Sequence, residues 1–272
     1  MKPASTLPLA GVGILVTRPV HQSDNLTQRI RDLGGNPVLF PALQIEMLPQ
    51  AFIDRERLAD CDYAIFVSPN AARIGMDLIR AAGGVPAKLR LAAIGPATAA
   101  ELGKAGSTNA GGREIITGPR GFDSDALLAV LPRELVAGRR IAVFRGEGGR
   151  ELLGETLRER GGRVEYIECY RRVRPAGDMR GVVSRWQRGE IGASIATSAE
   201  IVTNLFAMAG AEGLRWLRDT PMFVPHPRVA AAAFQRGVQA LVVAGAGDQA
   251  LVAALETWFG RLRPEHALTP AT

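Results

Sequence analysis

The sequence predicts an α/β protein of two lobes, each built on a parallel sheet, and three observations support this. Short apolar runs alternate with amphipathic segments along the 272 residues, as in βα units. One pattern occurs twice: residues 14–18, followed by glycines at 34–35, return as residues 141–145, followed at the same spacing by glycines at 161–162. The length suits about two domains of roughly 150 residues each. A crevice between two such units is the expected place for a ligand.

The expected strands are short apolar runs bounded by Gly, Pro, Arg or Ser. They are residues 14–17, 64–67, 91–94, 141–144, 194–196, 222–224 and 240–243. Helices are expected where apolar residues recur at spacings of three and four. They are residues 23–33, 70–82, 97–105, 125–130, 151–160, 199–208, 229–236 and 248–259. Several are followed by glycine, as at Gly34 and Gly161, where the left-handed conformation that ends a helix costs least.

Two segments break this alternation in the same way. Residues 36–48 and 163–173 are longer, extended and semi-polar, and they occupy equivalent places in the two repeats. We interpret them as connectors between the lobes that can pair with each other. The tail, residues 264–272, lacks periodicity and is expected to fray.

Composition narrows the class of partner. Hydrophobic residues make up 47% and charged residues 22%, which is ordinary for a globular protein. The net charge of +6, with Arg far ahead of Lys, favours acidic partners, because guanidinium groups pair with carboxylates and phosphates. Aromatic residues are too few and scattered for a base-stacking surface, so nucleic acid is not expected.

Membrane and metal sites are not expected either. No uninterrupted apolar stretch approaches the roughly 18 residues of a membrane span, so we expect a cytoplasmic protein. Cys61 and Cys169 lie far apart and without CxxC spacing, so neither a metal site nor a disulfide framework is predicted. Ordinary buried thiols explain both cysteines.

Two equivalent strand-to-helix turns carry candidate binding residues. In the first, Ser68 precedes Pro69, a combination that starts helices well on its own account. The amides and dipole of such a helix start also attract anions, so capping and ligand binding both remain open. The candidate substrate-binding residues are Ser68, Asn70 and Ala71 in the first turn and Thr197, Ser198 and Ala199 in its counterpart.

A second pair of turns adds a cation. Gly95 would let a ligand approach the backbone, and Thr98 supplies a hydroxyl in the following first turn. The counterpart has His226 in place of the glycine and Arg228 at the helix start. For the first turn, a plain turn with a helix start and a ligand-binding turn both remain open. For His226, a polar loop residue is a simpler interpretation than a general acid.

The segment 144–150 is rich in glycine but lacks both the dinucleotide fingerprint and a P-loop ending. It is interpreted as an anion-binding turn with Arg145, Gly146 and Arg150, the counterpart of Thr17 and Arg18 in the first half. No Ser–His–Asp order, metal cluster or carboxylate pair is found, so any reaction would rest on positioning and electrostatics.

Over roughly residues 13–259, the chain resembles the uroporphyrinogen-III synthase family. The resemblance is carried by LVTRP at 15–19, FVSPNA at 66–71, AIGPATA at 93–99, FRG at 144–146 with RELL at 150–153, and residues 166–172. Each motif alone is a weak indicator of the family, whereas the order and spacing of the motifs together are fairly specific for it. One departure is His226-Pro227-Arg228, where many members have a Gly-Pro-Thr type of turn, which suggests that a guanidinium replaces a threonine contact.

The resemblance implies two lobes of parallel-sheet, flavodoxin-like build joined by a two-stranded linker. The first lobe would be discontinuous, comprising 1–38 and 174–263, and the second would comprise 49–163. The linker strands would be 39–48 and 164–173. We expect a monomer.

The resemblance also implies a reaction. Hydroxymethylbilane, a linear tetrapyrrole with several carboxylates, loses its terminal hydroxyl as water, and its last pyrrole ring is inverted through a spiro intermediate before closure to uroporphyrinogen III. No cofactor or metal is expected. The family's tyrosine falls on Tyr170, where it would assist departure of the hydroxyl, and its hydroxyl-bearing turns fall on Ser68, Thr98 and Ser198. The alternative is a non-catalytic two-lobed module that binds an anionic small molecule.

Overall fold

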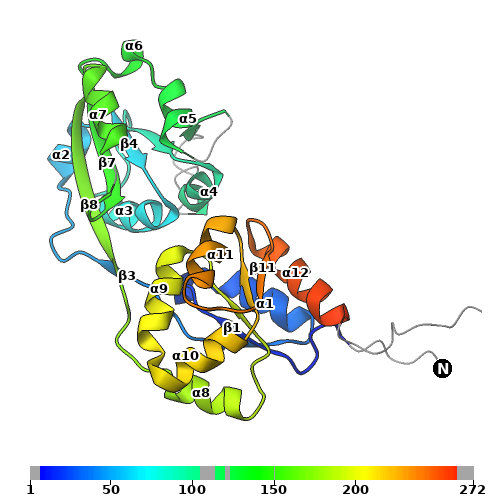
Figure 1. The fold of residues 1–272 in the computed structure, drawn as a ribbon. Helices are drawn as coiled ribbons and strands as arrows, with labels where there is room; N and C mark the ends of the chain where they lie inside the picture. Colours follow the sequence, from blue (N-terminus) through cyan, green and yellow to red (C-terminus); the bar gives the residue numbers. More distant parts are fainter. Residues whose placement is uncertain (1–6, 105–113, 120–122, 150, 262–272) are drawn as a thin grey trace, which may run out of the picture. The chain divides into compact units, whose positions relative to one another are not determined.

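The structure, a computed structural model, describes residues 7–104, 114–119, 123–149 and 151–261. The predicted tail at 264–272 and Arg150 lie outside these residues. The chain divides into two compact units, which are considered separately (Figure 1). Unit 1 comprises Met1–Gln44 and Val173–Thr272, and unit 2 comprises Ile45–Arg172.

Unit 1 contains a five-stranded parallel sheet in the order β11-β10-β9-β1-β2. This is the flavodoxin-like order, in which the strand order reverses between β1 and β9. The strands are β1 (Gly13–Val16), β2 (Asn36–Leu39), β9 (Ala193–Ile195), β10 (Met222–Val224) and β11 (Leu241–Val243).

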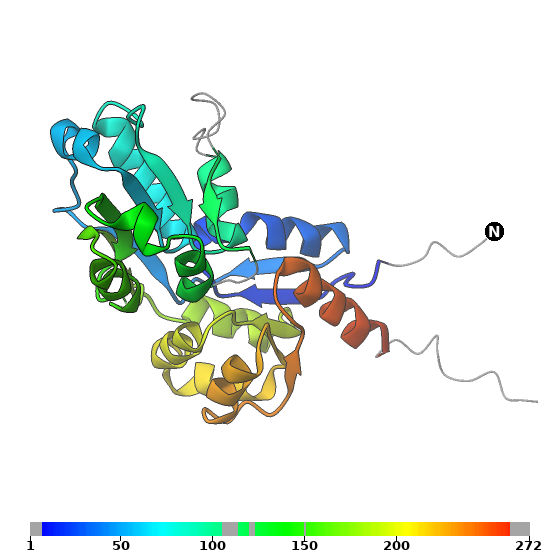
Figure 2. The ribbon, with the colours of Figure 1, turned by 90° about the horizontal axis from the view of Figure 1, so that it is seen from above.

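Helices cover both faces of this sheet. Successive strand residues point to opposite faces, so Ile14 and Val16 pack with one helical layer while Leu15 packs with the other. The first layer contains α1 (Asp24–Asp32) and α12 (Asp248–Arg261), and η1 (Val20–Gln22) precedes α1. The second contains α8 (Arg180–Gln187), α9 (Ala199–Met208), α10 (Gly210–Asp219) and α11 (Pro227–Phe234). Figure 2 shows blue α1 and the yellow helices on opposite sides of the strands.

Unit 2 contains a six-stranded sheet in the order β3-β8-β7-β4-β5-β6. The strands are β3 (Gln44–Met47), β4 (Tyr63–Phe66), β5 (Arg90–Ala93), β6 (Ile116–Thr117), β7 (Arg140–Gly146) and β8 (Arg163–Val173). From β8 to β6 the order repeats that of unit 1, with β7 in the place of β1 and β4 in the place of β9. The sequence repeat therefore corresponds to a repeat of topology.

Two helical layers also cover the sheet of unit 2. Phe66 and Phe144 stack at 4.8 Å between ring centroids within one layer, and Ile65 and Val143 lie in the other. The first layer contains α2 (Arg55–Asp60), α3 (Pro69–Ala81) and α4 (Pro96–Lys104). The second contains α5 (Ser124–Ala129), α6 (Arg133–Val136) and α7 (Leu152–Glu159).

The extended segment at 36–48 is divided between the two sheets. Its first part, β2, pairs with β1, and its second part, β3, neighbours β8. Pro37 is tolerated because β2 lies at a sheet edge. Beyond the strand, the amides of Phe40 and Ala42 still donate to the carbonyls of Val16 and Thr17, at 3.0 and 2.8 Å. The segment at 163–173 is instead one continuous strand. Beyond β3, the Leu48 amide donates to the Cys169 carbonyl at 3.1 Å.

The sequence did not predict β6, α2, α6, α8 or α10. Among the helices that the structure describes, none combines the length and apolar character needed to cross a membrane.

Candidate functional site

Several of the candidate residues lie where the strand order reverses, at the carboxyl edge of each sheet. In unit 1, β1 leads to Thr17 and Arg18, and its neighbour β9 leads to Thr197 and Ser198. In unit 2, β7 ends at Gly146, and its neighbour β4 leads to Ser68. Crevices at such reversal points are the usual ligand sites of open α/β sheets.

Ser68 and Ser198 form the same cap in the two units. The Oγ of Ser68 accepts from the Ala71 amide at 3.1 Å, and that of Ser198 accepts from the Ile201 amide, also at 3.1 Å. The amide of Ala71 is therefore already bonded within the helix start. Thr197 and Ala199 flank the second cap and are half-buried. A ligand anion at these turns would be held by the dipole and the remaining groups of the turn rather than by the capped amides.

The second pair of turns differs between the units. Gly95 has φ +76, a conformation that favours glycine, while Thr98 is 2% exposed. In unit 1, the Nδ1 atom of His226 accepts from the Arg228 amide at 3.3 Å, so an imidazole caps α11. The Arg228 side chain is exposed and makes no hydrogen bond or ion pair to the described residues, which leaves its charge available at the helix start.

Tyr170, Ser68 and Gly146 form one contact group in unit 2. The Tyr170 hydroxyl lies 3.0 Å from the Oγ of Ser68, and the Tyr170 side chain is 2% exposed. A bulge in the pairing of β7 with β8 places Tyr170 opposite Gly146. A Cβ at position 146 would lie 2.8 Å from the Cζ of Tyr170, so only glycine leaves room for the ring. Bulges commonly re-aim side chains beside active sites. Asn70 lies half-buried in the same helix start as Ser68.

Thr17 and Arg18 are bonded within unit 1. The Thr17 hydroxyl donates to the Ile195 carbonyl at 2.6 Å, and Arg18 makes two hydrogen bonds to the Asp248 carboxylate, at 2.7 and 3.1 Å. Asn25 donates to the same carboxylate at 2.6 Å. Burial raises the pKa of Asp248, but the hydrogen bonds from Arg18 and Asn25 outweigh it and leave the pKa below its ordinary value. The carboxylate therefore stays ionised beside Arg18.

Arg145, the repeat counterpart of Arg18, is also paired. It is 8% exposed and bonds to Glu151 at 2.8 Å and to Glu168 at 2.9 Å, while its guanidinium lies 3.7 Å from the ring centroid of Tyr166. Burial lowers the pKa of Arg145, but the Glu151 and Glu168 carboxylates raise it by more, so the pKa lies above its ordinary value. Both arginines were predicted to bind substrate. In the structure each arginine pairs with carboxylates of its own unit, and these pairs by themselves explain both charges.

The remaining candidates for metal or thiol chemistry are few. Cys61 and Cys169 are free and buried, and burial raises the pKa of Cys169 to about 12, so its thiol stays protonated. Across the part of the chain that the structure describes, no three His, Cys, Asp or Glu side chains gather into a group that could hold a metal ion.

Comparison with known proteins identifies the family. A family model described as "Uroporphyrinogen-III synthase HemD" matches residues 24–253. The uroporphyrinogen-III synthase of Escherichia coli (strain K12) is 31% identical over 252 residues, which cover 90% of this chain and all of the relative. The chain belongs to the uroporphyrinogen-III synthase family. The family predicted from the sequence motifs is thus confirmed. The synthase of Proteus mirabilis is 32% identical over 166 residues, covering 60% of this chain and 81% of its own.

Solved structures of uroporphyrinogen-III synthases have a similar fold. A mutant of the Thermus thermophilus protein superposes with a TM-score of 0.56 at 22% identity, covering 93% of this chain and all of the other. The protein of Helicobacter pylori 26695 also gives 0.56, at 13% identity and the same coverage. At these identities the likeness bears on the fold alone, and the predicted two-lobed parallel-sheet architecture is confirmed.

Proposed function

We propose that this chain is a uroporphyrinogen-III synthase that converts hydroxymethylbilane to uroporphyrinogen III with loss of one water and inversion of the last pyrrole ring. Membership of the family supports the activity. The observation that carries the mechanism is the hydrogen-bonded pair of Tyr170 and Ser68 at the carboxyl edge of the unit 2 sheet. It brings a phenol to a helix start, where anionic groups are stabilised.

The carboxylates of the substrate are proposed to bind at helix starts in both units. α3 and α4 begin after the neighbouring strands β4 and β5, and α9 and α11 begin after the neighbouring strands β9 and β10. Each unit thus presents two adjacent positive helix ends at one sheet edge. Neutral hydrogen bonds there contribute about 0.5–1.5 kcal/mol each, whereas Arg228, as a charged donor, contributes about 1.5–3 kcal/mol. Thr17, Arg18 and Arg145 are bonded within their own units, and we propose that they act mainly by holding the neighbouring loops in place.

Tyr170 is proposed to assist the departing hydroxyl. The Oγ of Ser68 already accepts the Ala71 amide, so it can donate its own proton to the Tyr170 oxygen. The phenol proton is then available to the substrate. As the bond between the terminal carbon and its oxygen breaks, the pyrrole nitrogen supplies an electron pair and Tyr170 protonates the leaving oxygen to give water. A proton released when the ring closes restores the phenol.

The proposal includes no cofactor and no metal, and it takes the protein to be a monomer acting in the cytoplasm. The sedimentation coefficient of the purified protein tests whether it is a monomer. Cell fractionation tests whether it is cytoplasmic.

The experiment is incubation of purified protein with enzymatically generated hydroxymethylbilane, without added metal or cofactor, and chromatographic separation of the product isomers. Unassisted closure gives type I, so the expected result is type III. If the product is type I while the protein still binds the substrate, the non-catalytic binding module replaces the enzyme.

A further inference from the structure

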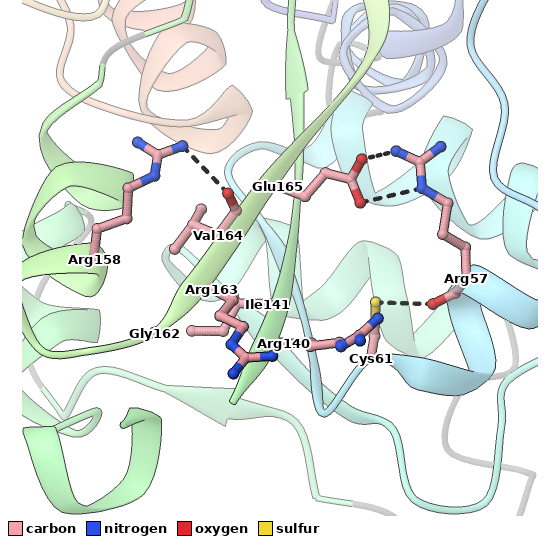
Figure 3. A pocket seen from close by; sticks show the side chains of 9 residues that line it. All are labelled: Arg57, Cys61, Arg140, Ile141, Arg158, Gly162, Arg163, Val164 and Glu165. Atoms are coloured by element: carbon pink, nitrogen blue, oxygen red, sulfur yellow. Dashed lines mark hydrogen bonds and ion pairs between the residues drawn. The ribbon is translucent and has the colours of Figure 1, made fainter. Parts of the chain in front are cut away.

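We propose that unit 2 has a second anion site, at the amino edge of its sheet, that binds a small molecule carrying at least two carboxylate or phosphate groups. A pocket of about 460 Å³ opens there, within the usual size of small-molecule sites (Figure 3). Arg140 and Arg163, at the starts of β7 and β8, line it, as do Arg57 and Arg158. Gly146 lies near the other end of these parallel strands, so the pocket is distinct from the site proposed above.

The pocket holds a pair of like charges, of which only one has a carboxylate partner among the described residues. Arg140 and Arg163 are direct partners in the register of β7 and β8. Like charges at paired positions of neighbouring strands repel each other. Arg140 is paired with Asp60 at 2.9 Å, but the Arg163 side chain makes no hydrogen bond or ion pair to the described residues. A bound anion would relieve this repulsion and accept hydrogen bonds from the planar, bidentate guanidinium of Arg163.

The other residues that line the pocket do not neutralise its excess positive charge. Glu165 is the one carboxylate that lines the described pocket, and Arg57 already holds it through both oxygens. Arg158 donates to the Val164 carbonyl at 3.3 Å and makes no ion pair with a described carboxylate. Figure 3 shows Arg158 on one side of β8 and Arg57 on the other. Because the cations approach from several directions, a ligand with two or more anionic groups fits better than a single ion.

Cys61 does not oppose an anion. It lines the pocket, and its thiol donates to the Arg57 carbonyl at 3.3 Å. Burial is the main cause that raises the pKa of this thiol, and neighbouring Asp62 adds to it. Cys61 is therefore neutral near pH 7 and presents a weakly polar wall.

The test is calorimetric titration of the full chain with citrate and, separately, with inorganic pyrophosphate, at constant ionic strength. Citrate carries carboxylates and pyrophosphate carries phosphate, so the two arms decide which chemistry the pocket prefers. We expect saturable binding of at least one probe and a loss of affinity of about tenfold or more in Arg163→Gln, since a charge-assisted contact is removed. Arg133→Gln, an exposed arginine of α6 outside the lining, should bind as the parent does.

Polyanions can also enter the proposed substrate site, so a further variant separates the two. Arg228→Gln should leave probe binding unchanged, and Arg163→Gln should leave the type III activity unchanged. The proposal is overturned if neither probe binds saturably, if the double variant Arg140→Gln/Arg163→Gln binds as the parent does, or if Arg228→Gln abolishes the binding. None of these outcomes depends on whether the protein makes the type III isomer.

Discussion

Replacing Tyr170 by phenylalanine removes one oxygen atom from the proposed reaction centre and leaves the ring in place. The ring is packed in the buried cluster of unit 2 and against Gly146, and these contacts survive the change. The hydroxyl makes one described hydrogen bond, at 3.0 Å to Ser68, which keeps its bond to the Ala71 amide. The variant should therefore fold normally.

The expected magnitudes separate a chemical role from a packing role. Loss of one neutral hydrogen bond should lower the free energy of unfolding by about 0.5–1.5 kcal/mol. Loss of a positioned proton donor should lower kcat by about a hundredfold or more. A change in stability of this size cannot reduce the folded fraction a hundredfold in a protein that is stable by several kcal/mol.

The assay measures the rate of type III formation and the melting temperature of the same samples. Tyr166→Phe is the matched control, because Tyr166 lies on the same strand and its hydroxyl donates to the Glu151 carbonyl at 3.2 Å. It should retain nearly full activity. If the two hydroxyls act as a unit, the double variant Ser68→Ala/Tyr170→Phe should lower kcat only slightly more than Tyr170→Phe alone does. Full activity of Tyr170→Phe, or equal losses in the two phenylalanine variants, would refute the proton-donor role.

Three further predictions concern other contacts. Gly146→Ala should lower the free energy of unfolding by about 1–3 kcal/mol and displace the phenol, because the added Cβ would meet the Tyr170 ring. The control is Gly103→Ala, which has open space around it and should leave the melting temperature unchanged or higher. Arg228→Ala should raise KM about tenfold or more at low salt and less at high salt, and an unchanged KM at low ionic strength would show that this side chain only faces solvent. Because the pKa of Asp248 is lowered in the folded state, its pairing stabilises unit 1 fully above the ordinary aspartate pKa of 3.8 and progressively less as pH falls below it. Asp248→Asn should therefore flatten the acid side of the melting-temperature profile, and identical profiles would contradict the pairing.

The strands and most helices could be predicted because each has a strong local signal. The repeated run at 14–18 and 141–145 identified β1 and β7, and the caps at Ser68 and Ser198 marked α3 and α9. Elements without such signals were missed. α10 begins at a glycine after Ala209, so no capping side chain marks its start in the sequence. Met179 before α8 provides no cap either, and the Asp178 carboxylate, which accepts from the Arg180 amide at 3.0 Å, was not recognised as the sign of a helix start.

The sequence predicted the turns that carry the candidate residues but not how their side chains pair. Arg18 and Arg145 were recognised as equivalent cations, yet the partner of Arg18 is Asp248, far away in the sequence, and sequence spacing carries no sign of that contact. The contact of Tyr170 with Gly146 likewise depends on a bulge in the strand pairing, which no local residue pattern specifies. The pocket at the start of β7 and β8 was missed, although the arginines at the starts of both strands were visible in the sequence.

The central claim is that helix starts in both units hold the carboxylates, and amide NMR of the protein titrated with oxygen-free uroporphyrinogen III tests it most directly. The account predicts saturable shifts for the first-turn amides of α3 and α4 in unit 2 and of α9 and α11 in unit 1, with one common dissociation constant. Tight product binding that shifts first-turn amides in only one unit, or in neither, would contradict it.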